Sequence, residues 1–166
     1  MGVVVSYFNP NGNRKDDPDP VTGLTSQDKT LIKTSWAKLR ADTTASGVKI
    51  FLTLFQHEPG YQKLFPFRDV PKDQLKQNKR FLAHCNSFMY GFSSLVDNVG
   101  DADILIELLK KQGEAHKPRG VEARAYDVVE NVLIEILEKD FDQQTVEAWK
   151  KGLKVMLKVI VEGANY

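Results

Sequence analysis

Two histidines are the residues of this sequence best suited to bind a metal. His84 and His116 lie 32 residues apart, each on a segment whose apolar residues recur at helical spacing. Between Phe51 and Phe92 the chain is unusually rich in phenylalanine. A neutral imidazole nitrogen binds haem iron, and a large apolar slot must cover the porphyrin. The two features together predict an apolar haem pocket in a helical protein.

Each histidine lies where its side chain can face such a pocket. His84, Phe88 and Gly91 are at positions i, i+4 and i+7, so they share one helix face with a polar group, an aromatic wall and room for a flat ligand. His116 is at the end of its helix, from which its ring can reach outward. The backbone carbonyl of Gln112, one turn earlier, is the expected acceptor for the ring nitrogen that does not bind iron.

The third histidine and the cysteine offer no comparable chemistry. His57 precedes Glu58 and Pro59 at a helix junction and is expected to be structural or exposed. Cys85 has no intrachain partner for a disulfide, and no phosphate-binding loop, nucleophile elbow or paired metal-binding motif is present in the sequence. The alternative is a helical interaction protein without a cofactor, which explains the amphipathic segments but neither the paired histidines nor the phenylalanines.

Helices must position these residues, and from Thr25 onward the chain predicts an all-α fold. Residues 25–28 form a capping-box pattern that opens a first helix. Residues 66–71 form a turn-rich connection before the long helix that carries His84. No internal repeat is evident. Prolines and capping residues mark the other helix ends, namely Pro59, Asn78, Asp101, Pro118 and Asp142.

Length, charge and hydropathy indicate a single-domain globular protein. With 166 residues, the chain is most simply one domain with one core. Its 23 basic and 22 acidic side chains give a net charge of +1, too little to attract a phosphate backbone, so nucleic acid is not an expected partner. No run approaches the ~20 apolar residues that cross a bilayer, and no signal peptide is visible. We expect an intracellular, cytoplasmic protein.

The first 24 residues differ from the rest, because turn-forming and charged residues replace apolar ones. We expect residues 1–24 to be a flexible extension and residues 25–166 to form the folded domain. The start, from Met1 to Ser6, satisfies the pattern for N-myristoylation at Gly2; an unmodified tail is the alternative. One acyl chain gives only marginal membrane binding, so such a tail would tether the domain peripherally to a cytosolic membrane face.

From about residue 24 to residue 163 the chain resembles the globin family. The residues that carry the resemblance are Trp36 in the first helix, Pro59 at the start of the third, Phe65 six residues later, His84 and His116. The resemblance implies a three-over-three helical sandwich of about eight helices that binds haem b. It also implies that His116 is the proximal iron ligand, that His84 lies on the distal side and that Phe65 stacks against the haem.

Further haem contacts are implied by position in the family pattern. Phe51 and Phe88 would complete the distal side, and Val121 would contact the haem. The candidates to pair with the haem propionates are the cations Arg68, Lys117 and Arg119.

Other segments refine the resemblance. Residues 64–71 and 19–25 look most like arthropod intracellular globins, and some related globins carry an acylated start. Gln112 departs from the family pattern, in which an apolar residue usually packs under the haem. Ala115 lacks the hydroxyl that often fixes the proximal ring.

The resemblance implies reversible binding of dioxygen, for storage or transport, by a protein that is not an enzyme. Carbon monoxide and nitric oxide are the other gaseous ligands expected. A second function stays open, in which His84 is the sixth iron ligand of a bis-histidyl, hexacoordinate globin. Its role would be redox or signalling chemistry, such as electron transfer, nitric oxide chemistry or lipid protection, at a membrane surface if the tail is acylated. Many globins self-associate, so a homo-oligomer also stays open.

Overall fold

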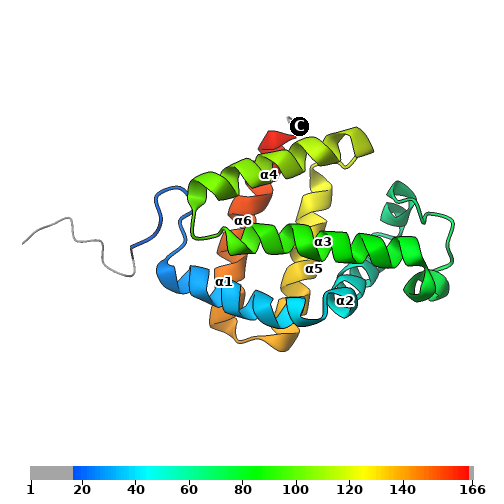
Figure 1. Cartoon of the computed structure of the whole chain (residues 1–166), viewed down its shortest axis with the longest axis horizontal. Coiled ribbons are helices and arrows are strands. Elements are labelled where there is room, and N and C mark those ends of the chain that lie inside the picture. Colours follow the sequence, from blue (N-terminus) through cyan, green and yellow to red (C-terminus); the bar gives the residue numbers. More distant parts are fainter. Residues whose placement is uncertain (1–16, 165–166) are drawn as a thin grey trace, which may run out of the picture.

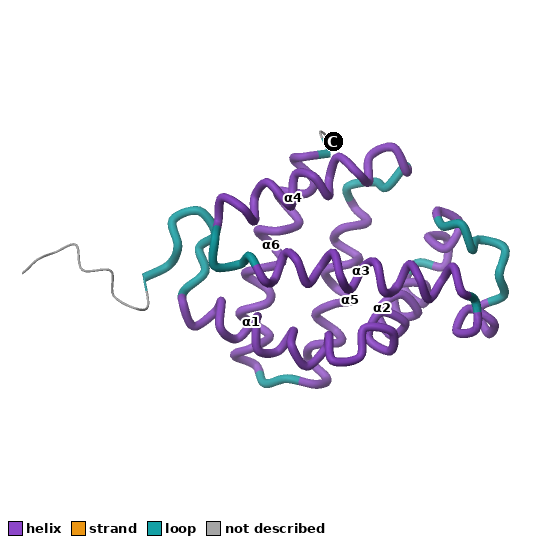
Figure 2. The backbone as a smooth tube through the Cα atoms, in the orientation of Figure 1, coloured by secondary structure: helices purple, strands orange, loops and turns teal. Residues whose placement is uncertain are grey.

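The computed structural model describes residues 17–164, which are largely helical (Figure 1; Figure 2). Gly2, the expected acylation site, lies outside these residues. Within them there are six α-helices, four 3₁₀ helices and no strand, which confirms the all-α prediction. The α-helices are α1 (Ser26–Leu39), α2 (Thr43–His57), α3 (Lys79–Asp97), α4 (Ala102–His116), α5 (Arg124–Asp140) and α6 (Gln143–Gly163). The 3₁₀ helices are η1 (Arg40–Asp42), η2 (Pro59–Leu64), η3 (Lys72–Gln77) and η4 (Lys117–Arg119).

Side-chain caps start the helices where the sequence predicted. Thr25 Oγ1 accepts a hydrogen bond from the backbone nitrogen of Asp28, and the Asp28 carboxylate accepts one from the backbone nitrogen of Thr25, both at 3.0 Å. This capping box satisfies two backbone donors that would otherwise lack partners. Asn78 and Asp101 cap α3 and α4 as single acceptors, so both helices that carry the histidines begin as expected.

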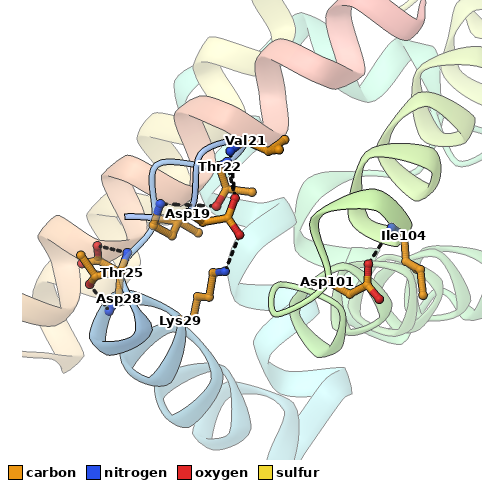
Figure 3. A network of polar contacts seen from close by, with 9 residues as sticks. Asp19, Val21, Thr22, Thr25, Asp28, Lys29, Asp101 and Ile104 are labelled. Carbon is orange, nitrogen blue, oxygen red and sulfur yellow. Dashed lines mark hydrogen bonds and ion pairs between the residues drawn. The ribbon is translucent and has the colours of Figure 1, made fainter. Parts of the chain in front are cut away.

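Residues 19–24 pack on the start of α1 (Figure 3). The Asp19 carboxylate accepts hydrogen bonds from the backbone nitrogen of Thr22 at 2.9 Å and from the Lys29 ammonium at 2.8 Å. The side chain of Leu24 is buried in the core at 1% exposure. An aspartate-centred turn and a buried leucine therefore hold residues 19–24 on the helices, next to the expected boundary after residue 24.

The helices form two layers of three, the expected sandwich. α1, α3 and α4 lie across α5 and α6 in Figure 1, and α2 packs against both α3 and α5. α6 contacts α1, α4 and α5. Between the layers, Trp36, Trp149 and Phe92 pack together with ring centroids 4.7 to 6.0 Å apart. These large buried rings join α1, α3 and α6 into one core.

A close helix crossing fixes α3 next to His84. A Cβ on Gly47 of α2 would lie 2.8 Å from both the Cβ and the carbonyl oxygen of Cys85, so only glycine allows α2 and α3 to approach this closely. Cys85 is fully buried at the crossing, and burial raises the pKa of its thiol to about 12. Because Cys85 directly follows His84, the crossing also fixes the backbone of that histidine.

Candidate functional site

His116 is the last residue of α4, and its ring is partly buried. Its Nδ1 lies 2.7 Å from the backbone carbonyl oxygen of Gln112, the acceptor that the sequence predicted. A carbonyl oxygen can only accept a hydrogen bond, so Nδ1 carries the proton and a neutral ring keeps its lone pair on Nε2. The ring is therefore oriented to offer Nε2 as a ligand.

Tyr126 of α5 lies beside His116, with ring centroids 6.3 Å apart and the rings edge to face. The sequence indicated only a core role for Tyr126, and it is indeed buried. Its contact with the imidazole also restricts how that ring can turn. In the sequence, Tyr126 is only an aromatic residue near the start of the helix that follows His116. That position does not reveal a contact between the two rings.

His84 of α3 faces two phenylalanines. Its ring centroid is 4.8 Å from that of Phe51 and 4.9 Å from that of Phe65, both edge-on. Burial lowers the pKa of His84 below its usual value, and the charges of His116 and Arg119 lower it further. His84 is therefore a neutral imidazole at neutral pH, able to donate a hydrogen bond or to bind a metal.

A positive charge on protonated His116 would lower the pKa of His84, so the two histidines lie within electrostatic range of each other. The helices that carry them pack mainly against other helices, α3 on α2 and α4 on α6, and contact each other little. The side chain of Gln112 reaches from α4 toward α3, where its Nε2 lies 3.6 Å from the point that a Cβ on Gly91 would occupy. The polar side chain of Gln112 and the small residue Gly91 thus meet between these two helices.

The phenylalanines expected on the distal side form one aromatic wall. The ring centroid of Phe51 in α2 lies 5.8 Å from that of Phe65 and 5.4 Å from that of Phe88, both edge-on. Phe65 directly follows η2, and Phe88 lies one turn after His84 in α3. Three segments distant in the sequence therefore bring these rings together, and two of the rings, those of Phe51 and Phe65, contact His84.

Phe67, which was not predicted, supports this wall. It is 2% exposed and stacks on Phe65 with ring centroids 5.1 Å apart and planes 15° apart. Its centroid also lies 6.0 Å from that of His84. The sequence shows phenylalanines on both sides of Pro66. The sequence of a turn does not reveal which of the two rings faces inward.

The cations predicted to meet propionates lie on the surface. The Arg119 guanidinium donates a hydrogen bond to the backbone carbonyl of Ala115, and its charge acts on the pKa of His84. Val121 is partly buried against the core. The other two exposed cations are Arg68 and Lys117. Contact between these four residues and a cofactor remains a prediction.

His57 is exposed, as expected. Its Nε2 lies 2.7 Å from a carboxylate oxygen of Glu135, which joins the end of α2 to α5. This exposed pairing fits a structural role for the third histidine.

Comparisons of the sequence and of the structure with known proteins all identify similar haem proteins or globins. The family model Globin matches residues 48–160. A globin of Nerita albicilla is 30% identical over 149 residues, which cover 87% of this chain and 95% of that protein. The structure of a hexa-coordinate hemoglobin of Drosophila melanogaster is 29% identical, with a TM-score of 0.79, and the match covers 82% of this chain and 93% of the other. A hexacoordinated heme protein from an anhydrobiotic tardigrade is 25% identical, with a TM-score of 0.81 and coverages of 89% and 99%. The chain belongs to the globin family.

Proposed function

We propose that this globin binds haem b between α3 and α4. The observation that carries the proposal is the pair of imidazoles in one region, His116 with Nε2 oriented as a ligand and His84 kept neutral by burial. Porphyrin iron takes such nitrogens as axial ligands, and the macrocycle needs apolar surroundings. Phe51, Phe65 and Phe88 supply an aromatic wall, so the residues present fit this group.

His116 is the proposed proximal ligand. The hydrogen bond from its Nδ1 to the Gln112 carbonyl fixes the tautomer and raises the basicity of Nε2. Val121, partly buried in the segment after η4, is proposed to contact the haem. The residues proposed to pair with propionates are the exposed cations Arg68, Lys117 and Arg119.

We further propose reversible binding of dioxygen as the function. When bound, haem supplies a ferrous iron that takes up dioxygen, carbon monoxide or nitric oxide. His84 donates a hydrogen bond into the distal space, where a partly anionic ligand accepts it strongly. The surrounding phenylalanines exclude water and so slow oxidation of the iron. This role in storage or transport requires no enzymatic activity.

The position of His84 also favours a second function. The His84 imidazole, neutral through burial and within electrostatic range of His116, would serve as a second histidine ligand to the iron, and an external ligand would then have to displace it. Two similar solved structures are described as hexacoordinate. The corresponding role would be redox or signalling chemistry, such as electron transfer, nitric oxide chemistry or protection of lipid.

An absorption spectrum of the purified protein tests both functions. It is recorded in the ferric state, after reduction with dithionite and after addition of carbon monoxide. A broad single visible band in the ferrous state is expected for an open site that binds dioxygen. Two sharp bands before any gas is added would instead assign His84 to the iron. Absence of a haem band after reconstitution would contradict the haem proposal.

The proposed location is the cytoplasm, with an acylated Gly2 as the proposed peripheral tether to a membrane. No helix between residues 17 and 164 has the length and apolar character needed to span a membrane. Intact mass of the full chain, produced with and without an N-myristoyltransferase, tests the acylation. Sedimentation equilibrium of the same samples tests whether the chain forms a homo-oligomer.

A further inference from the structure

Two glycines hold α4 directly against α6. A Cβ on Gly113 of α4 would overlap the carbonyl oxygen of Ile160 and lie 2.8 Å from the backbone nitrogen of Ala164. A Cβ on Gly163 of α6 would lie 2.8 Å from the Cα and 3.0 Å from the carbonyl oxygen of Lys110. Each glycine therefore faces the backbone of the other helix, and the two helices touch backbone to backbone.

This contact tolerates no side chain at either glycine. Real Cβ atoms essentially never approach another atom closer than 3.0 Å, and the opposing atoms belong to helix backbones that cannot turn aside. Any larger residue must therefore shift α4 relative to α6. Glycine inside a helix costs about 0.5–1 kcal/mol relative to alanine, so local helix stability does not explain these two residues. The close approach of α4 and α6 explains why glycine occupies both positions.

The contact lies next to the proposed proximal ligand. Gly113 is three residues before His116 and Lys110 is six residues before it, so both lie in the last two turns of α4. The ring of His116 is tied to the same turns by its hydrogen bond to the Gln112 carbonyl at 2.7 Å. α3 contacts α4 little, so α6 is the element that fixes where α4 lies. A shift of α4 on α6 must carry the imidazole with it.

We propose that Gly113 and Gly163 are positioning residues for His116: the backbone contact that they permit sets where its Nε2 meets the iron. Neither glycine needs to touch the cofactor, since both act through the placement of α4. Reacting groups are sensitive to such placement, and a misplacement of about 1 Å can cost roughly 100-fold in a geometry-dependent step. The proposal rests on the proposed function in one respect, namely that His116 binds the iron.

The first test is Gly163→Ala in the haem-loaded full chain. The iron–imidazole stretching band is measured by resonance Raman spectroscopy immediately after photolysis of the carbon monoxide complex, so that it is visible whether or not His84 binds iron. Haem release to an excess of an apoglobin acceptor is measured in parallel. We expect the band to move to lower wavenumber and haem release to be at least about threefold faster, because a shifted imidazole bonds less well. An unchanged band in a folded variant overturns the proposal, even if the variant is less stable.

Three further variants make the result specific. Gly60→Ala is the matched control, because a Cβ on Gly60 meets no atom within 4 Å, and it should leave band and release rate unchanged. Gly113→Ala should change both in the same direction as Gly163→Ala. If Gly113→Ala does not fold, Gly163→Ala at the end of α6 decides alone, with folding checked by circular dichroism. If His116→Ala retains the wild-type band, the assignment of His116 as the iron ligand fails. If His116→Ala loses the band but Gly163→Ala retains it, the positioning role of the glycines fails.

Discussion

The ring of His84 meets the ring of Phe51 edge-on, with centroids 4.8 Å apart, which places this imidazole in an aromatic corner. Phe65 closes the other side of this corner at 4.9 Å. Phenylalanine has no oxygen or nitrogen acceptor, so packing alone holds the imidazole there. The N–H of the imidazole is then available to the proposed distal ligand.

Replacing His84 with leucine is expected to separate ligand stabilisation from haem retention. Haem should stay bound in His84→Leu, since His116 is unchanged, but dioxygen dissociation should be about tenfold faster or more. A hydrogen bond to a charged group contributes about 1.5–3 kcal/mol, and about 1.4 kcal/mol corresponds to tenfold. Autoxidation should rise as well. Stopped-flow displacement of dioxygen measures the rate, His57→Leu at the exposed histidine is the control, and unchanged kinetics would contradict the role assigned to His84.

Removing the ring of Phe67 is expected to weaken both the fold and the pocket. Phe67→Ala should lower the free energy of unfolding by about 3–5 kcal/mol, as for other buried phenylalanines, and should speed haem release because Phe65 loses its stacked neighbour. Urea denaturation and haem transfer measure the two effects. Phe141→Ala, at a partly buried phenylalanine outside the wall, should cost less stability and leave haem release unchanged. Equal haem release in both variants would show that Phe67 does not support the pocket.

Features set by neighbours in the chain were predictable from the sequence. The capping box of Thr25 and Asp28 requires residues three apart, and the contact between His116 and Gln112 requires residues four apart on one helix. Such contacts depend on helix geometry alone. The shared face of His84 and Phe88 was predictable for the same reason, and both rings contact Phe51.

Features set by packing between distant segments were not predictable in this way. Nothing near Gly163 indicates that it faces α4, because the opposing backbone is about fifty residues earlier in the chain. The inward position of Phe67 depends on how the turn after η2 meets α3. Burial of Leu24 depends on α6 as well as on α1, which the composition of the first 24 residues does not reveal.

The turn before α1 is expected to stabilise the protein in a pH-dependent manner. Hydrogen bonds from the Lys29 ammonium and from the backbone nitrogens of Thr22 and Val21 hold the pKa of the Asp19 carboxyl well below its usual value of 3.8. The unfolded chain therefore binds this proton more readily, so the stabilisation is present above about pH 4 and is lost as the pH falls below that value. Asp19→Asn should lower the urea midpoint at pH 7 and have a smaller effect at pH 3. Asp103→Asn, at an exposed position, is the control, and an equal loss at both pH values would contradict the charge effect.

The thiol of Cys85 is expected to report opening of the crossing between α2 and α3. It is fully buried and its pKa is raised to about 12, so at pH 8 it is both protonated and inaccessible, and a disulfide reagent should label it only when the structure opens. Gly47→Ala places a methyl group against Cys85, which should cost about 1–3 kcal/mol as other overpacked cores do and should speed labelling. Gly60→Ala is the control, because its added methyl group meets no atom within 4 Å, so neither the packing nor the labelling rate of Cys85 should change. Rapid stoichiometric labelling of Cys85 in the native wild-type chain would show that the crossing of α2 and α3 is open. The crossing would then not fix the backbone of His84.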